Sequence, residues 1–329
     1  QLDAEWAADG SYIPGTGMFG GNEQFDKTDV EDSEVHTYLS PRLGVSFPVT
    51  DQTVFHAQYG QFYQSPSLSD LYLSPFYLDA FVSRGGYFTT LDNPNLKPPK
   101  TTSYEIGFKQ MLGNLASVQL TTFYKETEDL IQVMNVTTDV TNIAFSRNGD
   151  FGTVKGLDII FNLRRYKNLA ATFNYELQYA TGTGSATNSN FNIAWQGGAR
   201  GNFPKFAMPL DFEQRHTGSL NLDYRLGRTE GPKFLHNAGA NLMFSFNSGH
   251  PYTLMQVFNT MPFTGRYDNT NVSETPVSAV NSQTTPWVFR VDLKLDKKFY
   301  IGGVQLTAYA WALNLLNTEN VANVWITTG

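Results

Sequence analysis

Apolar and polar residues alternate over ten separate segments of the chain, each about as long as one β-strand. Around residue 106, for example, Tyr104, Ile106 and Phe108 fall on one side, while Glu105 and Lys109 fall on the other. This period of two is typical of a strand with two unlike faces. The predicted strands cover residues 43–49, 55–59, 104–108, 118–124, 157–163, 169–179, 220–226, 240–246, 287–295 and 304–313.

The last of these strands has an ambiguous pattern. Val304, Leu306 and Ala308 lie on one side of it, but Tyr309 and Trp311 lie on the other. Large apolar side chains therefore stand on both faces, and the alternation does not decide which face is the apolar one.

The connections between the strands alternate in length. Short turns are predicted at 50–52, 112–114, 164–168, 227–235 and 299–303, and long excursions at 63–101, 135–149, 182–214 and 248–286. Structureless loops of this length count against a compact soluble domain. In an outer-membrane barrel one rim carries short periplasmic turns and the other carries long extracellular loops. The pattern predicts an all-β fold, a transmembrane antiparallel β-barrel.

A soluble β-sandwich or propeller is the alternative, because its half-exposed strands also alternate. The exposed face of a soluble sheet is normally rich in Lys and Glu, whereas the polar positions here are mostly Ser, Thr, Asn and Gln. Charged residues make up only 16% of the chain and aromatic residues 14%, against roughly 25% charged residues in ordinary soluble domains. Aromatic residues also recur at the ends of the apolar rows, as interfacial girdles do. These features favour the barrel.

Several other classes are excluded or disfavoured by composition. The sequence has no run of about 18 apolar residues, so a transmembrane helix is excluded. Cysteine is absent, which removes disulfides, thiolate metal sites and cysteine nucleophiles. The net charge of −7 argues against a nucleic-acid partner. The N-terminus lacks a basic region followed by an apolar core, so we expect a mature chain or a fragment.

The glycine-rich motifs do not indicate a nucleotide site. Gly15, Gly17 and Gly20 have the spacing of the dinucleotide fingerprint, but Pro14 precedes them and Gly21 follows. The fingerprint works only between a strand and the N-terminus of a helix. We therefore predict a loop here and in the small-residue stretch 181–189.

Metal and catalytic motifs are equally weak. The acidic segment 26–34 could offer oxygen ligands to calcium, but its spacing matches no calcium loop, and a solvated acidic loop is favoured. It contains Asp26, Asp29, Glu31, Asp32 and Glu34. The histidines never occur as HxxxH or HxH, and no serine lies in GxSxG. The sequence predicts no enzyme, no metal site and no cofactor.

Aromatic residues gather in the first long excursion. Two interpretations stay open: a platform on which a ligand stacks, or an internal core that keeps a long loop folded. The candidate ligand-contacting residues are Tyr72, Phe76, Tyr77, Phe81, Tyr87 and Phe88.

Short sequence blocks along almost the whole chain resemble, in order, the barrel domain of TonB-dependent receptors, closest to the Oar-like branch. The early blocks are Ser40-Pro-Arg-Leu-Gly-Val-Ser-Phe47, Tyr59-Gly-Gln-Phe-Tyr-Gln-Ser-Pro66, Asn93-Pro-Asn-Leu-Lys-Pro98 and Thr101-Thr-Ser-Tyr-Glu-Ile-Gly107. The later blocks are Phe123-Tyr-Lys, Asp129-Leu-Ile-Gln132, Val154-Lys-Gly156, Asp211-Phe-Glu-Gln-Arg-His216, Asn247-Ser-Gly-His-Pro-Tyr252 and Asn314-Leu-Leu-Asn317.

The resemblance implies a barrel of about 22 strands whose lumen is plugged, and energy supplied by an inner-membrane complex through the periplasmic protein TonB. The chain departs from that pattern because it shows no plug, no TonB box and no closing strand that ends in an aromatic residue. Residues 320–329 look like the start of another excursion. We therefore expect residues 1–329 to be the C-terminal part of the barrel domain, with the plug and the N-terminal part outside this chain.

The function expected from this resemblance is transport in the bacterial outer membrane. It would be energised uptake, or export, of a bulky solute without covalent chemistry. The expected partners are outer-membrane lipid, the TonB complex through the absent N-terminal region, and an extracellular solute of unknown identity. Two alternatives stay open: a passive pore like a porin, and a surface-binding or adhesion barrel without transport.

Overall fold

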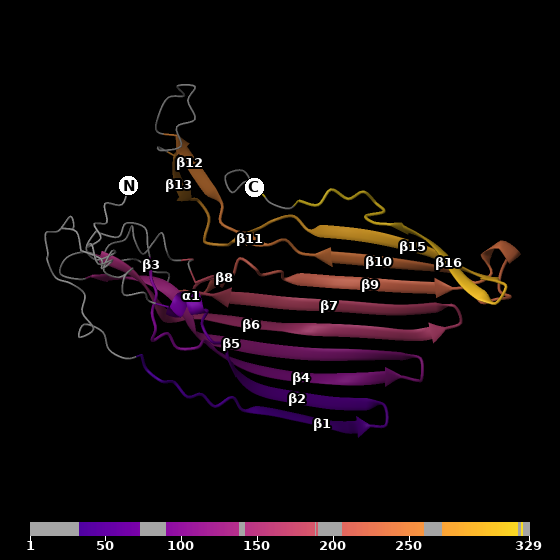
Figure 1. The fold of residues 1–329 in the computed structure, drawn as a ribbon, viewed down its shortest axis with the longest axis horizontal. Helices are drawn as coiled ribbons and strands as arrows, with labels where there is room; N and C mark the ends of the chain where they lie inside the picture. Colours follow the sequence, from indigo (N-terminus) through magenta and orange to yellow (C-terminus); the bar gives the residue numbers. More distant parts are fainter. Residues whose placement is uncertain are drawn as a thin grey trace, which may run out of the picture.

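Ten long strands lie side by side in one sheet, in the order β1-β2-β4-β5-β6-β7-β9-β10-β15-β16 (Figure 1). Every neighbouring pair on this path is antiparallel. The strands are β1 Arg42–Thr50, β2 Thr53–Tyr63, β4 Lys100–Leu112, β5 Ala116–Thr137, β6 Asn142–Tyr166, β7 Leu169–Gly182, β9 His216–Arg225, β10 Ala238–Asn247, β15 Val288–Ile301 and β16 Val304–Ala312. The computed structural model describes residues 33–72, 90–137, 142–187, 189, 206–259, 272–321 and 324.

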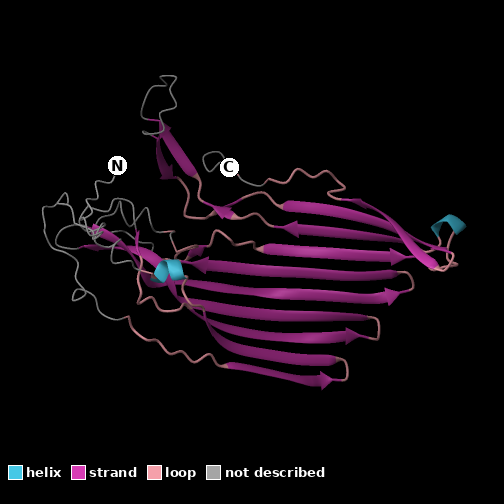
Figure 2. Cartoon of the chain, viewed as in Figure 1, coloured by secondary structure: helices cyan, strands magenta, loops and turns pink. Residues whose placement is uncertain are grey.

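Smaller elements lie in the connections, and Figure 2 shows how little of the described chain is helical. They are α1 Leu68–Leu71, β3 Thr90–Leu91, β8 Met208–Pro209, a 3-10 helix Lys233–Leu235, β11 Pro251–Tyr252, β12 Met255–Asn259, β13 Val272–Pro276 and β14 Gln283–Thr284. Strand β3 pairs with β6, and β8 pairs with β7, while β11 with β14 and β12 with β13 form two small sheets.

The two ends of the main sheet are unlike, as the connection lengths predict. All the short turns lie at one end, on the right in Figure 1, and α1 and the small strands lie at the other end. The tight turns use backbone with positive φ, at Gly113 (59°), Lys167 (53°) and Gly303 (86°). Such φ values match the twist of a two-residue or three-residue hairpin connection. We call the two ends the short-turn end and the long-connection end.

All ten predicted strands are confirmed, but the predicted excursion at 135–149 is wrong. Strands β5 and β6 continue through it with Thr137 paired to Asn142, so that β5 has 22 residues and β6 has 25. Their pairing register shifts between Thr127 and Ile131, and Asp129 there has a φ of 59°. A bulge of this kind adds residues to one strand and breaks the period of two. The strand pattern is therefore interrupted in the sequence although the pairing continues.

The apolar face of the sheet is exposed in the part of the chain that the structure describes. Leu43, Val45 and Ile106 expose 70%, 62% and 51% of their surface. A soluble sandwich would cover such a face with a second sheet, and no described element does so. A contiguous apolar face of this size fits a sheet whose surroundings are not water.

The register of β16 resolves the ambiguous pattern of residues 304–313. Leu306 pairs with Phe299, and Ala310 pairs with Leu295, so the even-numbered residues of β16 share the apolar face. Trp311 therefore lies on the polar face, where it pairs with Lys294. The Lys294 ammonium lies 5.8 Å from the centre of the Trp311 ring, a cation–π contact that suits an aromatic ring on a polar face.

Glycines beneath rings of neighbouring strands bring the strands close together. Phe246 covers Gly218, and Phe123 covers Gly156; in both pairs a Cβ added to the glycine would collide with the ring. Gly156 is also directly against the carbonyl oxygen of Leu177 on β7. Backbone and ring thus occupy the space that a side chain at residue 156 would need.

Replacing Gly156 with alanine is therefore expected to lower the free energy of unfolding by about 1–2 kcal/mol, because overpacking forces the ring and backbone to move. Urea titration of the full-length protein in lipid vesicles measures this change. Gly152→Ala, on the same strand, is the matched control, since a Cβ at Gly152 would make only ordinary contacts at 3.7 Å or more, and its effect should stay within about 0.5 kcal/mol. Equal effects of the two changes would contradict the packing described here.

Candidate functional site

Strand register sorts the side chains into two faces. Residues paired in register point to the same face of a sheet. One apolar row runs across six strands through Phe47, Phe55, Phe108, Leu120, Ile159 and Tyr175. The Phe55 ring lies 5.0 Å from that of Phe47 and 5.2 Å from that of Phe108, centre to centre. The predicted assignment of these alternating positions to one face is confirmed.

Aromatic rings gather toward the long-connection end of the apolar face. Tyr59 and Tyr104 have ring centres 5.3 Å apart. On the other half of the sheet, the His216 ring stacks on the Trp287 ring, with the ring centres 5.4 Å apart. The Tyr175 hydroxyl is hydrogen-bonded to His216 Nδ1 at 2.8 Å. Rings with a polar tip suit a boundary between an apolar medium and water. We call this set of residues the aromatic band.

The opposite, polar face carries charges in the middle of the sheet. Asp158 on β6 pairs directly with Glu176 on β7. Two carboxylates in this position repel one another. Lys125 on β5 attracts both, and Glu105 on β4 adds a further negative charge near Asp158. The middle of the polar face is therefore an acidic surface with one cation close to it.

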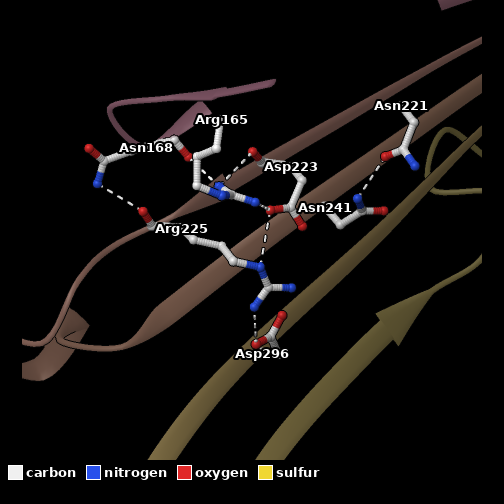
Figure 3. A network of polar contacts seen from close by, with 7 residues as sticks. All are labelled: Arg165, Asn168, Asn221, Asp223, Arg225, Asn241 and Asp296. Atoms are coloured by element: carbon white, nitrogen blue, oxygen red, sulfur yellow. Dashed lines mark hydrogen bonds and ion pairs between the residues drawn. The ribbon is translucent and has the colours of Figure 1, made fainter. Parts of the chain in front are cut away.

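An ionic network crosses the polar face at the short-turn end (Figure 3). Arg225 donates from Nε to Asp223 Oδ1 and from Nη1 to Asp296 Oδ2, each at 3.0 Å. Arg165, beside the turn between β6 and β7, donates to the same Asp223 oxygen and also to the Asn168 carbonyl. Asp296 is 8% exposed, so its ionised carboxylate is stabilised by Arg225 rather than by water. The network joins β6, β9 and β15.

Gly239 lets this network pass over β10. Arg225 on β9 and Asp296 on β15 both pair in register with Gly239, which stands between them. A Cβ at Gly239 would lie 2.9 Å from Asp296 Oδ1 and 3.0 Å from Arg225 Nη1. The missing side chain leaves the space in which the arginine reaches the carboxylate two strands away.

The turn between β9 and β10 is fastened to the same region. Asn168 Nδ2 donates to the Arg225 carbonyl at 2.8 Å and to Glu230 Oε2 at 2.6 Å. The Gly227 backbone N–H also donates to Glu230 Oε2, at 2.8 Å. This backbone hydrogen bond, followed by that of Asn168, lowers the pKa of the exposed Glu230 carboxyl. The short-turn end is thus held by side chains as well as by the strands.

The structure places only one of the six candidate ligand-contacting aromatics. Tyr72 follows α1 and is 72% exposed. The other five, Phe76, Tyr77, Phe81, Tyr87 and Phe88, lie outside the described residues. Their role as a ligand platform stays a prediction.

The acidic segment 26–34 also lies mostly outside the described residues. Of its carboxylates only Glu34 is described, with an oxygen 3.9 Å from His36 Nε2. Within the described ranges, no group of three or more His, Asp or Glu side chains is placed to hold a metal ion. No helix in those ranges is long and apolar enough to cross a membrane.

The ionic network was not singled out from the sequence. The sequence does show Asp223, Arg225 and Asp296 on polar rows, and the charges alternate in sign along the row that contains Asp296. Arg165 joins the network from the end of β6 by bonding to Asp223. Arg225 on β9 reaches Asp296 on β15 across β10, so the network follows only from the register of these strands. The signal that could have found the network is Gly239 between two charged rows.

Comparison with known proteins agrees with the geometry. The family described as "TonB dependent receptor-like, beta-barrel" matches residues 7–315. No curated protein matches the chain. Among solved structures, the FrpB iron transporter from Neisseria meningitidis has a TM-score of 0.53 at 14% identity, covering 85% of this chain and 35% of its own. The outer membrane transporter YddB from Escherichia coli has a TM-score of 0.52 at 15% identity, covering 85% and 37%.

A third structure, Pseudomonas aeruginosa FpvA bound to heterologous pyoverdines, has a TM-score of 0.52 at 13% identity, covering 85% of this chain and 29% of its own. Identities this low show likeness of fold alone. The chain spans about a third of the length of these transporters and receptors. The family match covers most of the chain, and the open two-faced sheet has the fold of these barrels. The chain belongs to the TonB-dependent receptor-like β-barrel family.

Proposed function

We propose that residues 1–329 form the C-terminal part of the barrel domain of a TonB-dependent receptor of the Oar-like branch. The full-length protein would carry a bulky solute across the bacterial outer membrane, by energised uptake or by export, through a plugged barrel of about 22 strands. It would do so without covalent chemistry. The observation that carries this proposal is the family match over residues 7–315.

The geometry supports a membrane placement. The exposed apolar face would meet lipid, and the aromatic band would lie at the outer interface, where amphipathic rings gather. The long connections would then be extracellular and the short turns periplasmic. The polar face would line the lumen, with the ionic network of Arg165, Asp223, Arg225 and Asp296 near the periplasmic rim.

Two measurements on the full-length protein test the coupling to TonB. The soluble periplasmic domain of TonB is expected to bind the purified receptor in detergent, measured by surface plasmon resonance. Liposomes that contain the receptor should remain as impermeable to raffinose as empty liposomes, because a plugged barrel is closed at rest. Rapid raffinose entry without TonB binding would establish the passive pore instead. Impermeable liposomes without TonB binding would favour the adhesion barrel.

A further inference from the structure

A cavity of about 450 Å³ lies at the long-connection end of the polar face. Its walls come from the segment 64–70 around α1, from Thr101 on β4, from residues 127–131 on β5, from Asp150 on β6 and from residues 184–187. Cavities of this size commonly hold small ligands. Thr101 and Thr127 lie on the same face as Glu105 and Lys125, so the cavity borders the polar face at its long-connection end.

The lining combines hydroxyl groups with apolar surface, and the apolar surface is the larger part of it. Six lining residues are serine or threonine, one is glutamine, and Asp70 and Asp150 are the only charged residues on the described walls. Thr101 and Thr127 have their hydroxyl oxygens 3.0 Å apart. A hydroxyl group donates and accepts hydrogen bonds and rotates to suit its partner. The lining thus matches a ligand that offers both apolar surface and groups that donate and accept hydrogen bonds.

Asp150 is buried in the wall of the cavity and held in place by a hydrogen bond. It is 4% exposed, and its Oδ1 accepts a hydrogen bond from the Thr183 hydroxyl at 2.8 Å. Thr183 is held in turn, because its Oγ1 accepts from the Phe151 backbone N–H at 3.1 Å. An ionised carboxylate has about four acceptor positions, so Asp150 retains acceptor capacity toward a ligand. Gly184 packs directly against this carboxylate and leaves no side chain over it.

These features discriminate among ligand classes. An anionic ligand would meet two carboxylates and no cation among the described lining residues. An apolar ligand would leave the buried Asp150 without a further donor, which is costly. A neutral polyhydroxylated ligand supplies hydroxyl donors to the carboxylates and both donors and acceptors to the serines and threonines. Its C–H faces would contact apolar lining such as Leu130 and Ile131.

The geometry points to this cavity as a binding site for a neutral oligosaccharide at the mouth of the barrel. This inference rests on the proposed transport function for its biological meaning, since it names the class of solute, but binding can be measured without transport. Asp150 would accept hydrogen bonds from sugar hydroxyls, and Thr127 would contact the same ligand from β5.

The test is binding of the full-length receptor in detergent to an array of neutral oligosaccharides, followed by titration of the best binder. Asp150→Asn keeps an acceptor for Thr183 and should weaken binding about tenfold or more, because it removes charge-assisted hydrogen bonds. Thr127→Val keeps the volume and should weaken binding by about 2–10-fold. Thr172→Val, on the same face at the short-turn end, should leave affinity unchanged, and circular dichroism checks that each variant is folded.

Several results would overturn the inference. These are the absence of any bound neutral oligosaccharide, or binding that Thr127→Val leaves unchanged. Spermidine and citrate are titrated as cationic and anionic probes, and tighter binding of either one than of any sugar would also overturn the inference. The same variants are tested for binding to the soluble TonB domain. Sugar binding without TonB binding supports the sugar site and contradicts the transport proposal. TonB binding without sugar binding supports the transport proposal and contradicts the sugar site.

Discussion

Replacing Leu242 with arginine is expected to lower the free energy of unfolding by about 2–4 kcal/mol, the cost of a cation on the lipid face near the middle of a membrane strand. Leu242 lies in the centre of β10 and pairs with Leu222 on β9 and Leu293 on β15. In the proposed membrane placement this row faces lipid. Urea titration of the full-length protein in phospholipid vesicles, followed by tryptophan fluorescence, measures the change.

The adjacent residue provides the matched control. Met243 is on the polar face, 44% exposed, and pairs with Asn221 and Asp292. An arginine there reaches water and a carboxylate, so Met243→Arg should cost less than about 1 kcal/mol. If Met243→Arg destabilised the protein as much as Leu242→Arg does, the assignment of the two faces would be wrong.

Replacing Arg225 with methionine should lower the free energy of unfolding by about 2–3 kcal/mol. Removing one partner of a fully buried ion pair costs about 3–5 kcal/mol; the Arg225 side chain is 39% exposed, which reduces the cost. The change leaves Asp296, whose side chain is 7% exposed, without its cation. The measurement is the same urea titration in vesicles.

A double variant separates this mechanism from a loss of packing. In Arg225→Met with Asp296→Asn no unpaired carboxylate remains at residue 296, so part of the lost stability should return. Arg290→Met is the control for charge alone, because Arg290 is exposed and bonds only to Asp292 among the ion pairs of the described chain; it should cost less than about 1 kcal/mol. If the effects of Arg225→Met and Asp296→Asn simply added in the double variant, an ion pair between Arg225 and Asp296 would be contradicted.

The strands were predictable from the sequence because alternation is a local property. Each strand needs only its own residues to show two unlike faces, and the ten strands were found on this basis. The long β5–β6 hairpin was missed because its bulge around Asp129 shifts the phase of the pattern. A shift of phase within one strand looks, in sequence, like the end of that strand.

The sites were less predictable, because each combines residues that only the register brings together. Arg225 and Asp296 are 71 residues apart in sequence, and their contact depends on the glycine between them on β10. The cavity beside Asp150 joins five separate segments. The orientation of Trp311 was open for the same reason, since the Lys294 ammonium that accounts for it lies on the neighbouring strand.

The order of strands in the main sheet has a consequence for folding and for evolution. Each long strand pairs with the next long strand along the chain, and the hairpins closed by short turns have little entropy of loop closure to overcome. These hairpins can form first as local units and join afterwards. A mutation that lengthens or shortens a long connection therefore leaves the register of every short-turn hairpin unchanged, so the long connections can diversify while the pairing within these hairpins stays constant.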